Sequence, residues 1–166
     1  MLSYQIDEID QKILFLLAQD ARTPFLEIAR ECGVSGAAIQ QRVKKLVSNG
    51  IISGSRMIVK PSALGLTVCA FILVSLSENN KYPEVIKALK HVEEIVECHF
   101  VTGKAALLLK VYCFDNEHLM DVLLNTIQKI PNIQSTDTMI SLDEAFERQV
   151  LVKNYKDTSS SASSKS

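Results

Sequence analysis

Residues 33–50 read GVSGAAIQQRVKKLVSNG, and this stretch decides how the N-terminal part of the chain folds. Gly33 can end a preceding helix, Ser35 can cap the next one, and Asn49 with Gly50 supplies its stop. Apolar residues recur between these signals at helical spacing, which predicts one packed side. They are Ile39, Val43, Leu46 and Val47. The other side is small, amide-bearing and cationic, as expected of a helix that lies in a DNA groove.

Charge is segregated along this part of the chain. Residues 1–33 carry three basic and six acidic side chains, whereas residues 34–60 carry five basic ones and no Asp or Glu. The five are Arg42, Lys44, Lys45, Arg56 and Lys60. Gln and Lys are also ordinary exposed helix formers, so a plain solvated helix is the alternative. Segregated positive charge is typical of phosphate-binding surfaces and favours double-stranded DNA as the partner.

The composition limits the possible classes. With 166 residues, 47% hydrophobic and 22% charged, the chain fits one domain or two small ones. The net charge of -1 hides the basic segment. The sequence has no apolar run of about 18 residues and no leader-like start at MLSYQIDEID, so we expect a cytoplasmic protein without a membrane segment.

The four cysteines do not form a metal or redox motif. Cys32, Cys69, Cys98 and Cys113 have no close pair and no short histidine spacing. Cys98 and His99 are neighbours, but on a strand they would point to opposite faces. We therefore expect buried free thiols, no metal, no cofactor and no catalytic residue.

Two further helices are expected before residue 33. The first follows Ile6, with Asp7, Glu8 and Asp10 at the end where the helix dipole favours acids. The second follows a Thr23 cap with Pro24 at its first position and ends near Cys32–Gly33. With residues 33–50 they predict a helix-turn-helix. After it, IISGSRMIVK predicts a small hairpin, or wing, turned at residues 53–55, on which Arg56 could reach a phosphate.

The remainder alternates between strand and helix. The expected strands cover residues 66–76, 95–101, 105–114 and 133–142, and the expected helices cover about 82–91 and 116–130. This order predicts a ferredoxin-like βαββαβ sandwich with both helices on one side of the sheet. The fold class is therefore α+β, a winged helix-turn-helix domain linked to a ferredoxin-like domain. The expected boundaries are 1–60, 61–150 and an extension over 151–166 whose DTSSSASSKS end we expect to be disordered.

The sheet is expected to need a cover on its second face. Along residues 68–74 apolar residues occupy both alternating sets, and residues 106–112 behave similarly. The chain has no spare helix for that face, so a second copy is expected to cover it, burying on the order of 1,000 Å² or more. The alternative is a set of merely hydrophobic strands, which would be an aggregation hazard.

In this order and spacing, several strings resemble the Lrp/AsnC, or feast/famine, family of transcription regulators. They are IDEIDQKILFLL, DARTPFLEIAREC, VSGAAIQQRVKKLVSNGII, KPSALGL and VEEIVECHFVTGKAALLLKV, within about residues 4–150. The resemblance implies sheet-to-sheet homodimers that often assemble into octamers. It also implies that the third helix contacts DNA. The residues carried over are Ser35, Ala37, Ala38, Gln40, Gln41, Arg42, Lys44 and Lys45, with Arg42 and the lysines on phosphates and Gln40 or Gln41 on an adenine edge.

The resemblance also implies an effector site between dimers. Its residues here are Thr102, Gly103, Lys104, Ala106, Thr136 and Thr138. Relatives commonly continue the VTG string roughly as GDYDYLL, whereas this chain reads GKAALLL, which removes the acids that can meet an amino acid's ammonium group. Three alternatives stay open: a wider apolar pocket, an anionic ligand at Lys104, or an unused site.

The resulting hypothesis is a sequence-specific regulator whose assembly or DNA affinity responds to a small metabolite, such as an amino acid or derivative. A second hypothesis is an architectural DNA-wrapping protein without an effector. A third is an enzyme resembling tetrapyrrole decarboxylases. It is disfavoured because the ferredoxin-like region has only Arg148 as an arginine and three scattered histidines, His91, His99 and His118.

Overall fold

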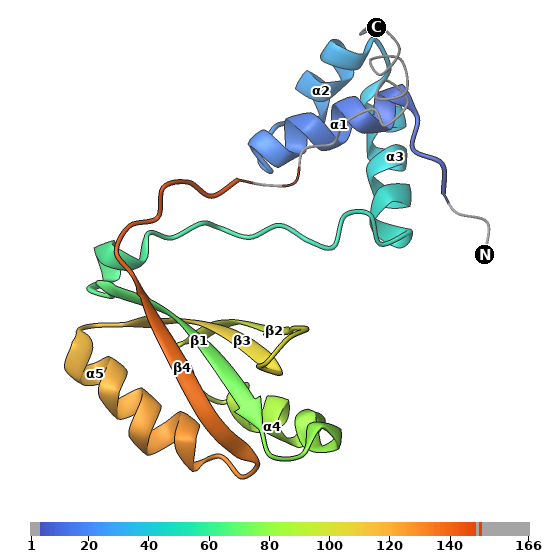
Figure 1. Cartoon of the computed structure of the whole chain (residues 1–166). Helices are drawn as coiled ribbons and strands as arrows, with labels where there is room; N and C mark the ends of the chain where they lie inside the picture. Colours follow the sequence, from blue (N-terminus) through green and yellow to red (C-terminus); the bar gives the residue numbers. More distant parts are fainter. Residues whose placement is uncertain (1–3, 149, 151–166) are drawn as a thin grey trace, which may run out of the picture. The chain divides into compact units, whose positions relative to one another are not determined.

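The computed structural model describes residues 4–148 and residue 150, and these form two compact units. One unit runs up to Met57 and includes the segment that begins at Glu147, and the other covers Ile58–Phe146. The predicted α+β architecture is confirmed, with three helices followed by a unit built on a four-stranded antiparallel sheet (Figure 1). The tail expected to be disordered lies outside the described residues.

Three helices build the first unit: α1 (Glu8–Gln19), α2 (Phe25–Cys32) and α3 (Gly36–Ser48). Their shared core is small and apolar. It contains Ile13, Ile28, Ala29, Ile39 and Leu46. Four of these side chains are completely buried, so each helix contributes at least one residue that anchors it.

The start of α2 differs from the expected cap. The cap prediction for Thr23 is wrong, because Pro24 is the N-cap residue and gives no side-chain hydrogen bond. The Thr23 hydroxyl instead donates to the Asp20 carbonyl oxygen at 2.7 Å. The hydroxyl is therefore used in the turn before the helix.

The predicted hairpin over residues 51–60 is wrong. The amides of Ile51 and Ile52 both donate to the Leu46 carbonyl oxygen, at 2.9 and 3.2 Å, and both side chains pack against the helical core. These residues complete the end of α3 and are not available as a first hairpin strand. Residues 53–60 then run as a single connecting segment with no strand pairing (Figure 1).

The second unit has the predicted βαββαβ order. Its strands are β1 (Val68–Leu76), β2 (Ile95–Phe100), β3 (Leu107–Cys113) and β4 (Ile133–Ser141), arranged β2-β3-β1-β4. Its helices are α4 (Tyr82–Leu89) and α5 (Asn116–Asp121). The helix expected over 116–130 continues beyond α5 as a π-helical segment, Val122–Thr126, and a 3-10 turn, Ile127–Lys129.

One face of the sheet is covered by the helices. The inward residues of β1 and β3 share a core with Val85 and Leu89 of α4 and with Leu119 of α5. The inward set is Ala70, Ile72, Val74, Leu76, Leu107, Leu109, Val111 and Cys113. Every second residue of β1 is therefore buried, and the residues between them point to the other face.

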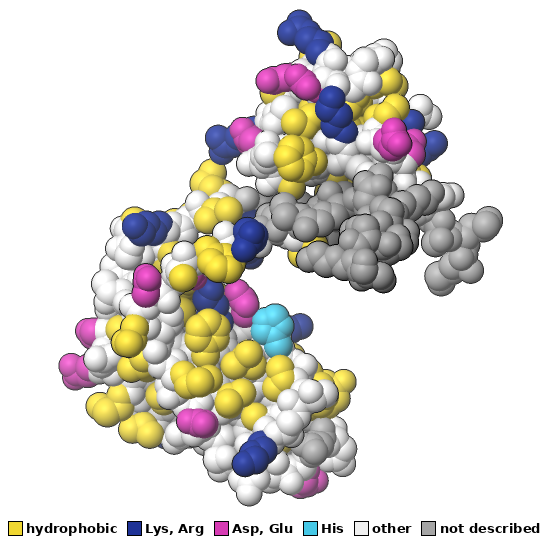
Figure 2. All heavy atoms as spheres, turned by 45° about the horizontal axis from the view of Figure 1, so that its top comes forward, with side chains coloured by type: hydrophobic (Ala, Val, Ile, Leu, Met, Phe, Trp, Pro, Cys, Tyr) yellow, Lys and Arg dark blue, Asp and Glu magenta, His cyan; other side chains and the backbone are white. Residues whose placement is uncertain are grey.

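The other face, which we call the open face, carries large side chains that are only half-buried. They include Phe71 and Leu73 of β1 with Leu108 and Tyr112 of β3. Hydrophobic side chains gather on the surface of this unit in Figure 2. Lys110 also lies on the open face, and sequence reasoning missed it. Its ammonium lies 5.9 and 5.5 Å from the ring centroids of Phe71 and Tyr112.

The cysteines are free thiols, as expected, but their burial differs. Cys113 is buried, and burial raises the pKa of its thiol to about 11. Cys98 is exposed, so the expectation of burial is wrong there, because β2 is an edge strand. No metal-binding group of His, Cys, Asp and Glu occurs in the described residues. No helix among them is long and apolar enough to cross a membrane.

Candidate nucleic-acid interface

Helix α3 begins and ends where the sequence indicates. Gly33 has a left-handed φ of 67° and closes α2. The Ser35 hydroxyl then accepts a hydrogen bond from the Ala38 amide at 3.2 Å, which caps α3. Asn49 is the C-cap, and Gly50 follows with a φ of 71°. These local signals fix the length of α3 on both sides.

The inner side of α3 is narrower than predicted. Ile39 and Leu46 are fully buried, and Val43 packs beside them. Val47, expected in the same stripe, is 52% exposed, so that part of the prediction is wrong. The buried stripe therefore ends at Leu46.

The outer side of α3 presents amides and cations to solvent. The exposed residues are Ser35, Ala37, Gln40, Gln41, Lys44 and Lys45, and Ala38 is half-buried. Within the described part of the chain, no carboxylate forms an ion pair with Lys44 or Lys45. Two cations on one helix face without acidic partners are suited to binding phosphate.

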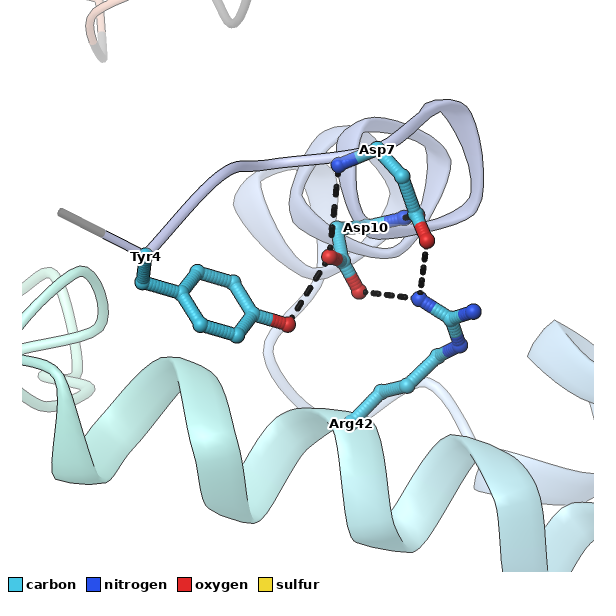
Figure 3. Close-up of polar contacts among 4 residues, drawn as sticks. All are labelled: Tyr4, Asp7, Asp10 and Arg42. Atoms are coloured by element: carbon cyan, nitrogen blue, oxygen red, sulfur yellow. Dashed lines mark hydrogen bonds and ion pairs between the residues drawn. The ribbon is translucent and has the colours of Figure 1, made fainter. Parts of the chain in front are cut away.

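Arg42 differs from the two lysines. Its Nη1 donates to Asp7 Oδ2 at 2.7 Å and to Asp10 Oδ1 at 2.8 Å (Figure 3). Asp10 is only 1% exposed and also accepts from the Tyr4 hydroxyl at 2.9 Å. We call Tyr4, Asp7, Asp10 and Arg42 the Arg42 cluster. It joins α3 to α1 and to the segment before α1.

The Arg42 cluster is electrostatically coupled. Burial alone would raise the pKa of Asp7, but the Asp10 amide and the Arg42 guanidinium hold it below its usual 3.8. Hydrogen bonds to Asp10 and Asp7 raise the pKa of Arg42. Burial and the hydrogen bond to Asp10 raise the pKa of the Tyr4 phenol. The cluster therefore favours an ionised Asp7 and an ionised Arg42.

Sequence reasoning placed Asp10 at the helix end and missed this pairing. A signal was present, because Asp10 precedes Ile13, Leu14 and Leu17 by three, four and seven residues and so shares their inward stripe. A carboxylate on an inward stripe needs a buried partner. Arg42 is that partner, and its predicted phosphate contact stays a prediction.

Arg56 lies outside α3. Its Nη2 is 3.6 Å from Glu147 Oε1, and both side chains are more than half exposed. Such an exposed pair contributes little and is easily exchanged for another anion. A DNA contact by Arg56 stays a prediction.

The predicted effector residues occupy two places. Thr102, Gly103 and Lys104 form the exposed loop between β2 and β3. Ala106 is 9% exposed and packs in the core, so its side chain is not presented to solvent. On β4, Thr136 pairs with Val74, whose carbonyl oxygen accepts the Ala106 amide from the other side. Strand β1 thus separates the loop from the β4 threonines by two strand spacings, about 10 Å.

A groove of about 470 Å³ runs between α5, its π-helical continuation and β4. Thr136 and Thr138 line it together with Asp137, and Gln128 donates to the Thr136 hydroxyl at 2.8 Å. Its remaining lining is mostly apolar: Asn116, Leu119, Met120, Leu123, Leu124 and Ile140. The groove therefore offers apolar surface beside hydroxyl and amide groups, whereas Asp137 pairs with Leu73 and directs its side chain to the open face.

Comparison with known proteins matches both units. Residues 6–47 match the AsnC-type helix-turn-helix domain, and residues 69–151 match the Lrp/AsnC ligand binding domain. The regulatory protein AsnC of Haemophilus influenzae is 42% identical over 147 residues, which span 89% of this chain and 98% of that protein.

Solved structures of regulators are also similar to this chain. The structure of Escherichia coli AsnC has a TM-score of 0.84 and 39% identity, covering 89% of this chain and 99% of that one. A feast or famine regulatory protein from Mycobacterium tuberculosis, complexed with L-methionine, has a TM-score of 0.82 and 30% identity, with coverage of 89% and 99%.

Proposed function

Because the chain belongs to the Lrp/AsnC family of transcription regulators, we propose that it binds promoter DNA through the outer face of α3 and responds to an amino acid or a derivative. The family consists of regulators and not of enzymes, so the decarboxylase hypothesis does not apply. The site of action is then the genomic DNA in the cytoplasm.

The observation that carries the DNA-binding proposal is the chemistry of α3. Lys44 and Lys45 are exposed and have no carboxylate partner within the described residues. Gln40 and Gln41 are exposed on the same helix, and an amide can donate to and accept from one adenine edge. We assign phosphate binding to the lysines and base reading to the glutamines.

The half-buried open face supports the same function. The open face carries half-buried Phe71, Leu73, Leu108 and Tyr112 within a single chain. A second copy placed against it would cover these side chains and present two α3 helices to two half-sites. We propose this homodimer as the DNA-binding form, with a higher oligomer such as an octamer built from it.

The groove beside β4 supports the effector proposal. An amino acid needs an acceptor for its ammonium group and donors for its carboxylate. The sequence alone indicated no acid, because Lys104 occupies the loop position, but Asp137 lies between Thr136 and Thr138 on the edge strand β4. We propose that Asp137, Thr136 and Thr138 of one copy meet the 102–104 loop of another around the ligand.

The test is footprinting of the purified full chain on promoter fragments of its own genome, with and without a mixture of the common amino acids. The proposal expects discrete protected sites whose extent or affinity changes with the mixture. Equal affinity for every fragment at moderate salt would instead indicate a DNA-wrapping protein. Absence of any salt-dependent DNA binding would refute the function itself.

A further inference from the structure

Arg42 lies near the centre of α3, but its side chain is directed at α1, whereas Lys44 and Lys45 are exposed to solvent. Arg42 precedes Lys45 by three residues, so the two residues are neighbours on the helix surface. The Arg42 guanidinium points toward the start of α1, where Asp7 and Asp10 receive it (Figure 3). The side chain of Arg42 is 28% exposed.

A phosphate would meet an unfavourable charge here. Two carboxylates surround one guanidinium, so the cluster carries one more negative charge than positive when all three are ionised. Lys44 and Lys45, which have no such partners among the described residues, are better phosphate ligands. Binding phosphate through Arg42 Nη1 would also leave the buried Asp10 carboxylate without its cationic partner.

The cluster can instead set the angle of α3 on α1. The apolar contacts of Ile39, Val43 and Leu46 attract without a preferred direction, so they allow small rotations of α3. Hydrogen bonds from a guanidinium to carboxylates are directional and strong. Asp10 is itself held by the Tyr4 hydroxyl at 2.9 Å, and Asp7 by the Asp10 amide at 2.8 Å.

We propose that Arg42 is a positioning residue of the DNA interface: it fixes the rotation of α3 through Asp10 and Asp7, and it does not bind phosphate itself. This proposal rests on the proposed DNA-binding function of α3. It reassigns one residue that the sequence alone grouped with Lys44 and Lys45.

Four full-length variants separate positioning from phosphate binding: R42M, D10N, Y4F and, as the phosphate reference, K44M. Each is titrated onto one labelled mixed-sequence duplex between about 50 and 200 mM salt, and circular dichroism confirms that it is folded at the assay temperature. K44M should flatten the slope of log affinity against log salt by about 0.9 for each phosphate that the variant no longer neutralises.

The positioning role predicts a different pattern for the cluster. R42M and D10N each weaken binding roughly 2- to 30-fold with the wild-type salt slope, the range seen when packed networks are cut. A fifth protein that combines R42M with D10N loses no more than either single variant, because both substitutions remove the same link. Y4F keeps all charges and so tests the proposal even if D10N fails to fold. Y4F should lose less DNA affinity than R42M, with the wild-type salt slope.

Three results would overturn the proposal. R42M could flatten the slope as K44M does, D10N could tighten binding by releasing Arg42 to a phosphate, or folded R42M and Y4F could bind like the wild type. Failure of the proposed function looks different, since the wild type would then show no salt-dependent binding and K44M would change nothing.

Discussion

The substitution R42M should destabilise the first unit more than any other single change of a cation on α3. Methionine keeps most of the aliphatic stem and its packing but removes the guanidinium. Asp10, 1% exposed, would keep only the Tyr4 hydroxyl at 2.9 Å and the long contact to the Asp7 amide at 3.4 Å. A buried carboxylate would thus lose its cationic partner.

The expected cost follows from the burial of the pair. Removing one partner of a fully buried ion pair costs about 3–5 kcal/mol, and because Arg42 is 28% exposed and water can replace part of it, we expect about 2–3 kcal/mol. The first unit is small, and a domain of roughly 60 residues has only about 3–9 kcal/mol of stability. The loss corresponds to a fall of roughly 10–20 °C in the unfolding midpoint of this unit.

Lowering the pH should reduce the stability that the Arg42 cluster provides. The pKa of Asp7 is lowered in the folded state, so its contribution is complete above the ordinary value of 3.8 and is lost as the pH falls through the lowered value. R42M removes one cause of that lowering. The variant should therefore lose less additional stability than the wild type as the pH falls below 3.8.

Hydrogen exchange on the full chain resolves the two units in one experiment. R42M should reduce amide protection in α1 and α3 and leave β1 and β3 unchanged. K45M is the matched control, because it removes a cation from the same helix that has no ion-pair partner among the described residues. Equal protection in R42M and the wild type, or an equal loss in K45M, would refute the reasoning.

Three other outcomes follow from the structure. S35A removes the cap of α3 and should lower the free energy of unfolding by about 1 kcal/mol in urea titrations, whereas S48A should cost clearly less; equal costs would contradict the cap. L73K places a charge on the open face and should convert dimers to monomers in light scattering. N125K, which changes an exposed position, should leave the dimer intact. A dimeric L73K would argue against pairing through the sheet. D137N should weaken the response of DNA binding to amino acids without changing binding in their absence, and an unchanged response would exclude the carboxylate from the site.

Local signals in the sequence predicted most of the backbone. Glycine and capping residues placed the ends of α3, since Gly33 and Ser35 act on the backbone within a few residues of themselves. The βαββαβ order followed from alternating apolar runs. Both kinds of signal act over short separations, which explains why they can be read without the fold.

Features that depend on distant residues were missed. The hairpin failed because Ile51 and Ile52 return to Leu46, a tertiary contact that outweighs their strand propensity. Arg42 looked like a phosphate ligand because its partners, Asp7 and Asp10, lie more than thirty residues earlier. Lys110 was overlooked among apolar neighbours, although Phe71 and Tyr112 receive its ammonium on the open face.

Site-specific photo-crosslinking tests most directly whether the outer face of α3 contacts DNA. A benzophenone amino acid replaces Gln41 in one full-length variant and Ala18, an exposed position on α1, in the other. Each variant is irradiated with a duplex that the wild type protects in footprinting. We predict an efficient cross-link from position 41 and little from position 18. A cross-link from position 18 with none from position 41, in variants that both bind the duplex, would contradict the assignment of α3 as the DNA-contacting helix.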